Sequence, residues 1–136
     1  MKYILFLLLT FPILASAQNT LSVEVQGVKN SEGNISVAVY KEAKGFLKFD
    51  QVYKSDSTQA KKGTTRLLIE DLPEGEYALA IFHDENGNNE LDTNWLGIPK
   101  EDIGFSNARM KTFGPPSFKE CSIPLHKSSE IKVILQ

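Results

Sequence analysis

The chain has 136 residues, with 15 Lys and Arg against 17 Asp and Glu and a formal net charge of −2. The charge is nearly balanced, and basic residues form no cluster beyond Lys61-Lys62, which argues against a nucleic-acid partner. The length fits one domain with one core. The single cysteine, Cys121, cannot form an internal disulfide. We expect it to be a small buried hydrophobe, with an intermolecular disulfide or a reactive thiol as the alternatives.

Residues 1–17, MKYILFLLLTFPILASA, have the pattern of a secretory signal peptide. Lys2 supplies the positive end, an apolar run follows, and Ala15-Ser16-Ala17 is the small-x-small pattern that signal peptidase cleaves. We predict a cut after Ala17 and a single mature domain, residues 18–136, that is secreted or periplasmic. No later stretch is long and apolar enough to cross a bilayer, so no membrane span is expected in the mature chain.

Apolar and polar residues alternate in several segments, which indicates half-buried strands. We predict strands at residues 21–29, 34–41, 64–72, 72–84, 120–125 and 130–136. The strand at 72–84 should be central, because both of its faces are apolar: Tyr77, Leu79 and Ile81 on one, Ala78, Ala80 and Phe82 on the other. Residues 44–63 form either a long connection or a short extra strand. With no helical periodicity, the fold class is all-β, an antiparallel β-sandwich of about seven strands.

The stretch HDENGNNELDTNWLGIP, residues 83–99, has oxygen-bearing side chains at alternate positions. Counted from Asp84, ligands fall at positions one, three, five, seven and nine, with Glu90 contributing its backbone carbonyl: Asp84, Asn86, Asn88, Glu90 and Asp92. Calcium loops have this spacing, because a chain wound around a hard cation presents alternate side chains inward. Asn89, where such loops usually have Gly, tolerates the left-handed conformation. We predict a structural calcium site here.

Two features weaken the match to a calcium loop. Trp95 occupies position twelve, where a bidentate Glu is expected, and only two of the four side-chain ligands carry charge. The predicted affinity is therefore low, on the order of 10⁻⁴–10⁻³ M. Glu101 could supply a further carboxylate from the following segment. The alternative is an Asx-rich turn without metal, since Asn86-Gly87 is a strong turn dipeptide.

A catalytic site has less support in the sequence. His83 and His126 are the only histidines and are not at metal-ligand spacing. His83, Asp84 and a serine such as Ser106 could be assembled into a hydrolase triad, but no G-x-S-x-G motif accompanies them. We expect His83 to be structural and the protein not to be an enzyme.

Aromatic residues lie in and after the long loop: Trp95, Phe105, Phe113 and Phe118. They could form a ligand platform, for which Trp95 and Phe105 are the candidate binding residues. They could instead cover one open end of the sandwich. We favour the covering role, because the Gly- and Pro-rich segment around them is typical of chain folded back onto a sheet.

The segments HDENGN…LD, LGIPKE…GFSN and GPPSF, taken together, resemble a bacterial family catalogued as a domain of unknown function, number twenty-one forty-one in its series. The resemblance covers nearly all of the mature chain. It implies a secreted or periplasmic immunoglobulin-like or prealbumin-like sandwich with no established activity, and it supplies no catalytic residues.

The stretch LPEGEY is also similar to the L-P-x-G-x-Y turn of carboxypeptidase regulatory-like and surface-adhesin B-type domains. That resemblance implies calcium loops, which some adhesin repeats of this kind carry. Related adhesin domains also hold Lys–Asn isopeptide bonds. We predict none here, because the last strand, EIKVILQ, has no Asn.

From these observations we expect a non-catalytic module of the cell envelope, of the binding or adhesion type, stabilised by calcium. Its partner would be an envelope or extracellular protein, a glycan or a small molecule. One alternative is a metal-dependent hydrolase that uses the same loop. Another is a small-ligand carrier, which would have an apolar cavity between its sheets.

Overall fold

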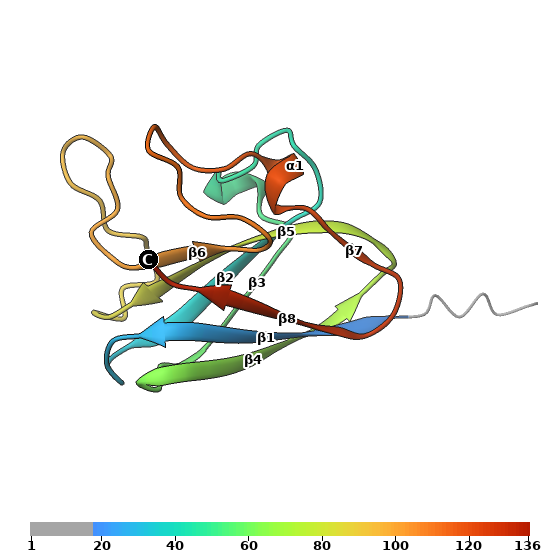
Figure 1. Cartoon of the computed structure of the whole chain (residues 1–136), viewed down its shortest axis with the longest axis horizontal. Helices are drawn as coiled ribbons and strands as arrows, with labels where there is room; N and C mark the ends of the chain where they lie inside the picture. The colour runs from blue at the N-terminus through green and yellow to red at the C-terminus, as the bar shows by residue number, and fades with distance from the viewer. Residues whose placement is uncertain (1–17) are drawn as a thin grey trace, which may run out of the picture.

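The computed structural model describes residues 18–136 and consists of two facing β-sheets with a layer of loops on one side (Figure 1). The predicted signal peptide, residues 1–17, lies outside the described residues. The eight strands of the described part are β1 Asn19–Val28, β2 Asn34–Tyr40, β3 Lys54–Gln59, β4 Gly63–Leu72, β5 Gly75–Asp84, β6 Ile103–Phe105, β7 Ile123–Leu125 and β8 Ser129–Ile134. The two short helical segments are η1 Phe49–Gln51 and α1 Phe118–Cys121. The all-β prediction is confirmed.

One sheet has three strands in the order β4-β1-β8, and the other has five. In the larger sheet the order is β3-β2-β5-β6, and β7 also pairs with β5. All pairs are antiparallel except β1 and β8, which run parallel with Leu21 opposite Ser129. The prediction of a purely antiparallel sandwich is therefore wrong at this edge of the smaller sheet.

The core lies between the two sheets and is built from alternate residues of each strand. Leu21 and Val23 of β1 and Leu79 of β5 are fully buried, and Ile81 is 1% exposed. Burying one such side chain stabilises the fold by about 1.5–3 kcal/mol relative to leaving it in water. The alternation seen in the sequence thus gives the inner face of the sandwich.

The opposite face of β5 carries a second apolar layer. Ala78 of β5 and Phe105 of β6 are buried on this face. They are covered by loops that lie on the outer side of the five-stranded sheet, away from β1, β4 and β8 (Figure 1). Strand β5 is therefore buried on both faces and lies inside its sheet, as predicted.

Residues 54–59 form β3, the short extra strand that was one of the two alternatives for residues 44–63. Two segments differ from the sequence prediction: β6 lies in a stretch for which no strand is predicted, and the strand predicted at 120–125 is reduced to β7, preceded by α1. The helix begins with a capping box: Ser117 Oγ accepts from the Glu120 backbone N–H (3.3 Å), and Glu120 Oε2 accepts from the Ser117 N–H (2.7 Å). Cys121 ends this helix, fully buried as expected, and burial raises the pKa of its thiol to about 11.

Candidate functional site

The acidic loop begins at the end of β5 and winds around Asp84. This residue is fully buried. Its Oδ1 accepts from the Asn88 backbone N–H (3.2 Å) and its Oδ2 from the Asn89 N–H (2.8 Å). A carboxylate has about four acceptor positions, so both oxygens keep capacity for a further partner. Asp84 therefore sets the curvature of the loop.

The tight bend of the loop uses two left-handed residues. Gly87 has φ +68° and Asn89 has φ +63°. Asn is among the few non-glycine residues that adopt this conformation readily. The role predicted for Asn89 in the turn is confirmed.

Two of the predicted ligand side chains, those of Asn86 and Asn88, contact the carboxylate of a third, Asp92. Asn86 Nδ2 donates to Asp92 Oδ2 (2.6 Å), and Asn88 Nδ2 donates to Asp92 Oδ1 (3.0 Å). The amide oxygens are also used: Asn86 Oδ1 accepts from the Asn88 N–H and Asn88 Oδ1 from the Glu90 N–H. Each amide oxygen retains one lone pair. The side chains of Asn86, Asn88 and Asp92 thus converge. The atoms that contact the Asp92 carboxylate are the amide nitrogens of the two asparagines and not their oxygens.

Glu101 joins the same cluster from the following segment. Its Oε2 accepts from the Asp92 backbone N–H (3.1 Å). Burial raises the pKa of Glu101 above its usual 4.5, and repulsion from the carboxylates of Asp92 and Asp84 adds to the effect, while hydrogen bonds from backbone amides oppose it. None of these three carboxylates has an ion-pair partner within residues 18–136. They form a site of concentrated negative charge.

A surface hollow of about 330 Å³ lies against this cluster, lined by Glu85, Asn86, Asp92, Thr93, Lys100 and Glu101. Glu90 points into solvent, and within residues 18–136 its carbonyl accepts no hydrogen bond. Over the same residues no three His, Cys, Asp or Glu side chains are grouped as a ready-made metal site. The carboxylates of Asp84, Asp92 and Glu101 are therefore neighbours without being grouped around one point, and the predicted ligand set relies on asparagine amides as well.

His83 and Ser106 are held by backbone groups and not by one another. His83 is fully buried, and its Nε2 lies 2.7 Å from the Glu32 carbonyl. Ser106 Oγ donates to the Cys121 carbonyl (2.6 Å) and accepts from the Leu79 N–H (2.8 Å). Together with the backbone contacts of Asp84, these bonds keep the three residues of the conceivable hydrolase triad in separate structural roles.

The aromatic residues divide into two groups. Phe105 is 6% exposed and packs on the outer face of β5, together with Phe118. Trp95 and Phe113 are 91% and 98% exposed at the tips of their loops. Phe105 and Phe118 therefore cover the outer face of the five-stranded sheet and not the open end of the sandwich that the sequence favours, and Trp95 and Phe113 cover neither. Trp95 and Phe105 also do not form one platform, because only Phe105 faces the sheet.

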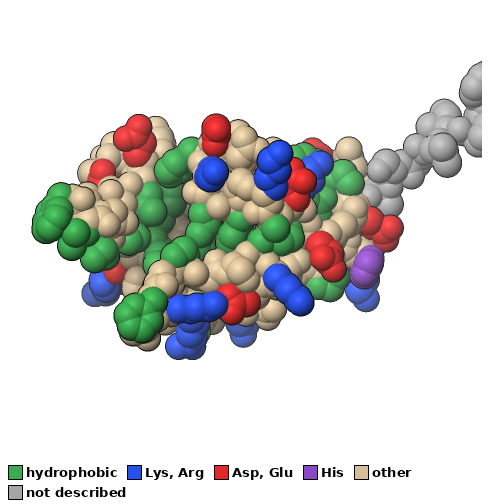
Figure 2. Space-filling model, turned by 90° about the horizontal axis from the view of Figure 1, so that it is seen from above, with side chains coloured by type: hydrophobic (Ala, Val, Ile, Leu, Met, Phe, Trp, Pro, Cys, Tyr) green, Lys and Arg blue, Asp and Glu red, His purple; other side chains and the backbone are tan. Residues whose placement is uncertain are grey.

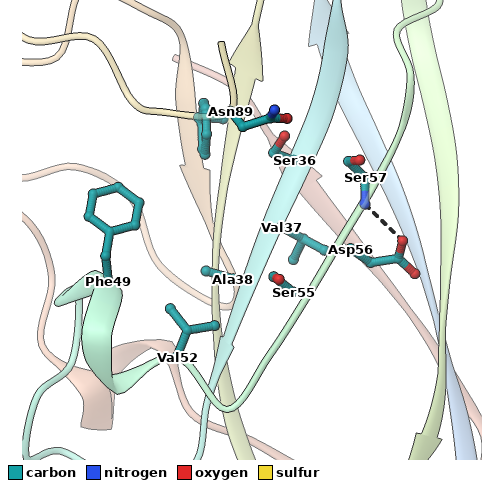
Figure 3. A pocket seen from close by; sticks show the side chains of 10 residues that line it. Ser36, Val37, Ala38, Phe49, Val52, Ser55, Asp56, Ser57 and Asn89 are labelled. Carbon is teal, nitrogen blue, oxygen red and sulfur yellow. Dashed lines mark hydrogen bonds between the residues drawn. The ribbon is translucent and has the colours of Figure 1, made fainter. Parts of the chain in front are cut away.

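An apolar hollow of about 220 Å³ lies on the outer face of the five-stranded sheet, with Phe105 in its wall. Figure 2 shows the molecule from the side of the loop layer, with hydrophobic side chains exposed along this face between the loops. A second, more polar groove adjoins it and shares Phe49, Ala38 and Phe82. In Figure 3, Phe49 and Val52 stand on one side of that groove, with side chains of β2 and β3 opposite them.

No helix in residues 18–136 has the length and hydropathy needed to cross a membrane. No curated protein matches the chain, and no solved structure does. A bacterial protein family matches it over residues 23–132, which is most of the chain and includes the acidic loop and both sheets. The chain therefore belongs to the family described as "Uncharacterized protein conserved in bacteria (DUF2141)".

Proposed function

We propose that this protein is a secreted or periplasmic, non-catalytic module of the immunoglobulin-like or prealbumin-like type, which binds calcium as a structural ion. The ligands would be side-chain oxygens of Asp84, Asn86, Asn88 and Asp92, the Glu90 carbonyl, and a carboxylate oxygen of Glu101. In the cell envelope such a module would serve binding or adhesion. The pattern of residues 1–17 supports export, and the two facing sheets support the fold type.

The observation that carries the calcium proposal is the convergence at Asp92. Its carboxylate contacts Asn86 and Asn88, its backbone contacts Glu101, and within residues 18–136 no basic side chain forms an ion pair with Asp84, Asp92 or Glu101, although Lys100 lines the adjoining hollow. Hard oxygen donors at this density suit a cation that takes six to eight of them. Glu101 supplies the carboxylate that the sequence lacks at position twelve.

The hydrogen bonds in the loop also favour low affinity. Calcium at Asp92 must displace the two amide N–H donors that occupy its oxygens, and each amide must turn to present oxygen. This reorganisation opposes binding, consistent with a dissociation constant on the order of 10⁻⁴–10⁻³ M. Extracellular calcium is abundant enough to fill a site of that class.

The first prediction concerns calcium uptake by residues 18–136. Isothermal titration should show one site per chain with a millimolar or submillimolar dissociation constant, and Asp92→Ala should abolish the heat because it removes the residue at which the other ligands meet. Asp56→Ala is the matched control, since Asp56 lies on β3 outside the loop and should leave the titration unchanged. A flat trace for the unaltered protein at millimolar calcium would show that the loop is an Asx-rich turn only.

The second prediction concerns pH. Because the pKa of Glu101 is raised, this carboxyl protonates at higher pH than an ordinary glutamate, and calcium affinity should fall as the pH drops through that raised pKa. Without calcium, the raised pKa of Glu101 lowers the free energy of unfolding as the pH rises through it. Calcium should offset this loss, and its binding should release the proton from Glu101 where that carboxyl is still protonated. Titrations in buffers of different ionisation enthalpy measure the proton release. Glu101→Gln should flatten the pH dependence, and an equally steep dependence in that variant would exclude Glu101 as the titrating group.

A hydrolase that uses the same loop is less well supported. Metal-assisted hydrolysis needs an open coordination position and a base beside it. The nearest histidine, His83, is buried and bonded to the Glu32 carbonyl. A small-ligand carrier with an apolar cavity between its sheets is also less well supported. The core fills the space between the sheets, and the apolar hollow lies outside it.

A further inference from the structure

We propose that the apolar hollow on the outer face of the five-stranded sheet binds a small, uncharged aromatic molecule of one or two rings. The hollow exists because its floor is made of small residues. Ala38 of β2 and Ala80 of β5 lie directly opposite each other in the sheet, and both line the hollow. Because the two alanine methyl groups are smaller than the side chains around them, they leave a depression in the surface of the sheet.

The walls of the hollow are rich in aromatic rings. Tyr40 and Phe82 continue the same faces of β2 and β5 on either side of the alanine pair, and Phe105 lies opposite Ala80 on β6. Aromatic rings favour aromatic partners in edge-to-face or offset-stacked geometry, with a gain of about 0.5–1.5 kcal/mol per pair beyond the area buried. A planar aromatic guest therefore fits these walls better than a flexible chain.

The chemistry of the lining selects against charge. Every residue around the hollow is apolar apart from the Tyr40 hydroxyl, and burial raises the pKa of that hydroxyl, so it stays neutral at physiological pH. A charged ligand would lose its hydration without finding a counter-ion, which is costly. One hydroxyl is enough to accept or donate a single hydrogen bond.

The volume limits the size of the guest. A dry apolar cavity of about 150 Å³ is known to take up benzene, so the 220 Å³ here can hold a one- or two-ring molecule such as indole. The hollow is smaller than most sites for drug-sized ligands, which occupy about 300–1,000 Å³.

Two of the loops that line the hollow are closed by their own backbone pairs, and Leu47 and Phe49 line it from a third segment. Thr93 pairs with Pro99, and Lys111 with Gly114. Pro99 of the first loop, and Pro115 immediately after the second, line the hollow. The part of the rim that these two loops form is thus built of constrained backbone and does not need to fold around a guest before binding.

The test is a titration of ¹⁵N-labelled protein with indole, followed by two-dimensional NMR in the presence of a chelator. The chelator makes the result independent of the calcium proposal. Amide signals of β2, β5 and β6 around the hollow should shift and saturate at millimolar or lower indole. Absence of saturable shifts would overturn the proposal.

Two variants and two analogues sharpen this test. Ala38→Leu fills the floor and should weaken indole binding at least tenfold, whereas Ala43→Leu, the same change in an exposed turn, should leave it unaltered. If Ala38→Leu does not fold, Ala80→Val provides the smaller filling change. Indole-3-acetate should bind at least tenfold more weakly than indole, and so should hexanol. Equal binding of the acid would refute the neutral site, and equal binding of hexanol would refute the aromatic preference.

Discussion

Replacing Asp84 by alanine should destabilise the protein even when calcium has been removed. Asp84 is fully buried, and its two carboxylate oxygens hold the backbone N–H groups of Asn88 and Asn89. Hydrogen bonds to a charged group contribute about 1.5–3 kcal/mol each, and water can partly replace them in this exposed loop, so the expected loss in the free energy of unfolding is about 2–4 kcal/mol. Urea unfolding in a chelator measures it.

The comparison with Asp92 separates the two roles of the loop carboxylates. Asp92 is partly exposed and its carboxylate contacts only asparagine side chains, so Asp92→Ala should cost about 1 kcal/mol or less in chelator. Both variants should lose the calcium-dependent rise in unfolding midpoint. An Asp84→Ala protein that unfolds in chelator like the unaltered protein would mean that the buried carboxylate does not organise the loop.

Replacing Gly33 by alanine should be among the most damaging single methyl additions. Gly33 lies just before β2 with φ +62°, and a Cβ built there would be 1.9 Å from the Asp84 carbonyl oxygen and 2.7 Å from that of Glu85. Both atoms are backbone, so relief requires the end of β5 to move away from β2. We expect a loss of about 3–5 kcal/mol, from overpacking together with the left-handed backbone. Calcium affinity should fall as well, because the acidic loop starts at the displaced residues.

Gly63→Ala is the matched control for this prediction. Gly63 has φ +91°, but no atom lies within 4 Å of the position its Cβ would take. Its substitution should therefore cost only the backbone strain, about 1–3 kcal/mol. Urea unfolding of the two variants side by side measures the difference. A Gly33→Ala protein no less stable than Gly63→Ala would contradict the close backbone approach at the start of the loop.

The sequence predicted well those strands whose two faces differ in environment. The bounds predicted for the first two strands, residues 21–29 and 34–41, agree with those of β1 and β2 to within a few residues. They agree because side chains that alternate between core and solvent also alternate in hydropathy. Strand β3, KSDSTQ, has no buried residue and lies at the edge of its sheet, so it carries no such alternation. Helix α1 is too short to show periodicity, although its capping box, Ser117 to Glu120, is a signal that can be read from sequence.

The candidate sites also differ in how far the sequence predicts them: local spacing is readable, and long-range pairing is not. The spacing within one short loop indicates that Asn86, Asn88 and Asp92 lie close together, because a tight loop brings alternate residues together, but it does not indicate that amide nitrogens contact Asp92. The position of Glu101 does not follow from the spacing, because Glu101 reaches Asp92 only through backbone pairing of the segment between them. The apolar hollow could not be predicted, because it depends on which residue of β5 stands opposite Ala38, and alternation gives the face of a strand but not its register with a neighbour.

The parallel pairing of β1 with β8 has a consequence for assembly. Thr20 donates its backbone N–H to Ser128 Oγ, a contact between residues 108 positions apart, and the β1–β8 ladder begins directly after it. Strand β1 is the middle strand of its sheet, so one of its edges stays unpaired until that distant segment arrives. Closing so long a stretch of chain costs entropy before any contact rewards it. The smaller sheet therefore gains its third strand only after the C-terminal segment has been synthesised, although β1 can pair with β4 before then.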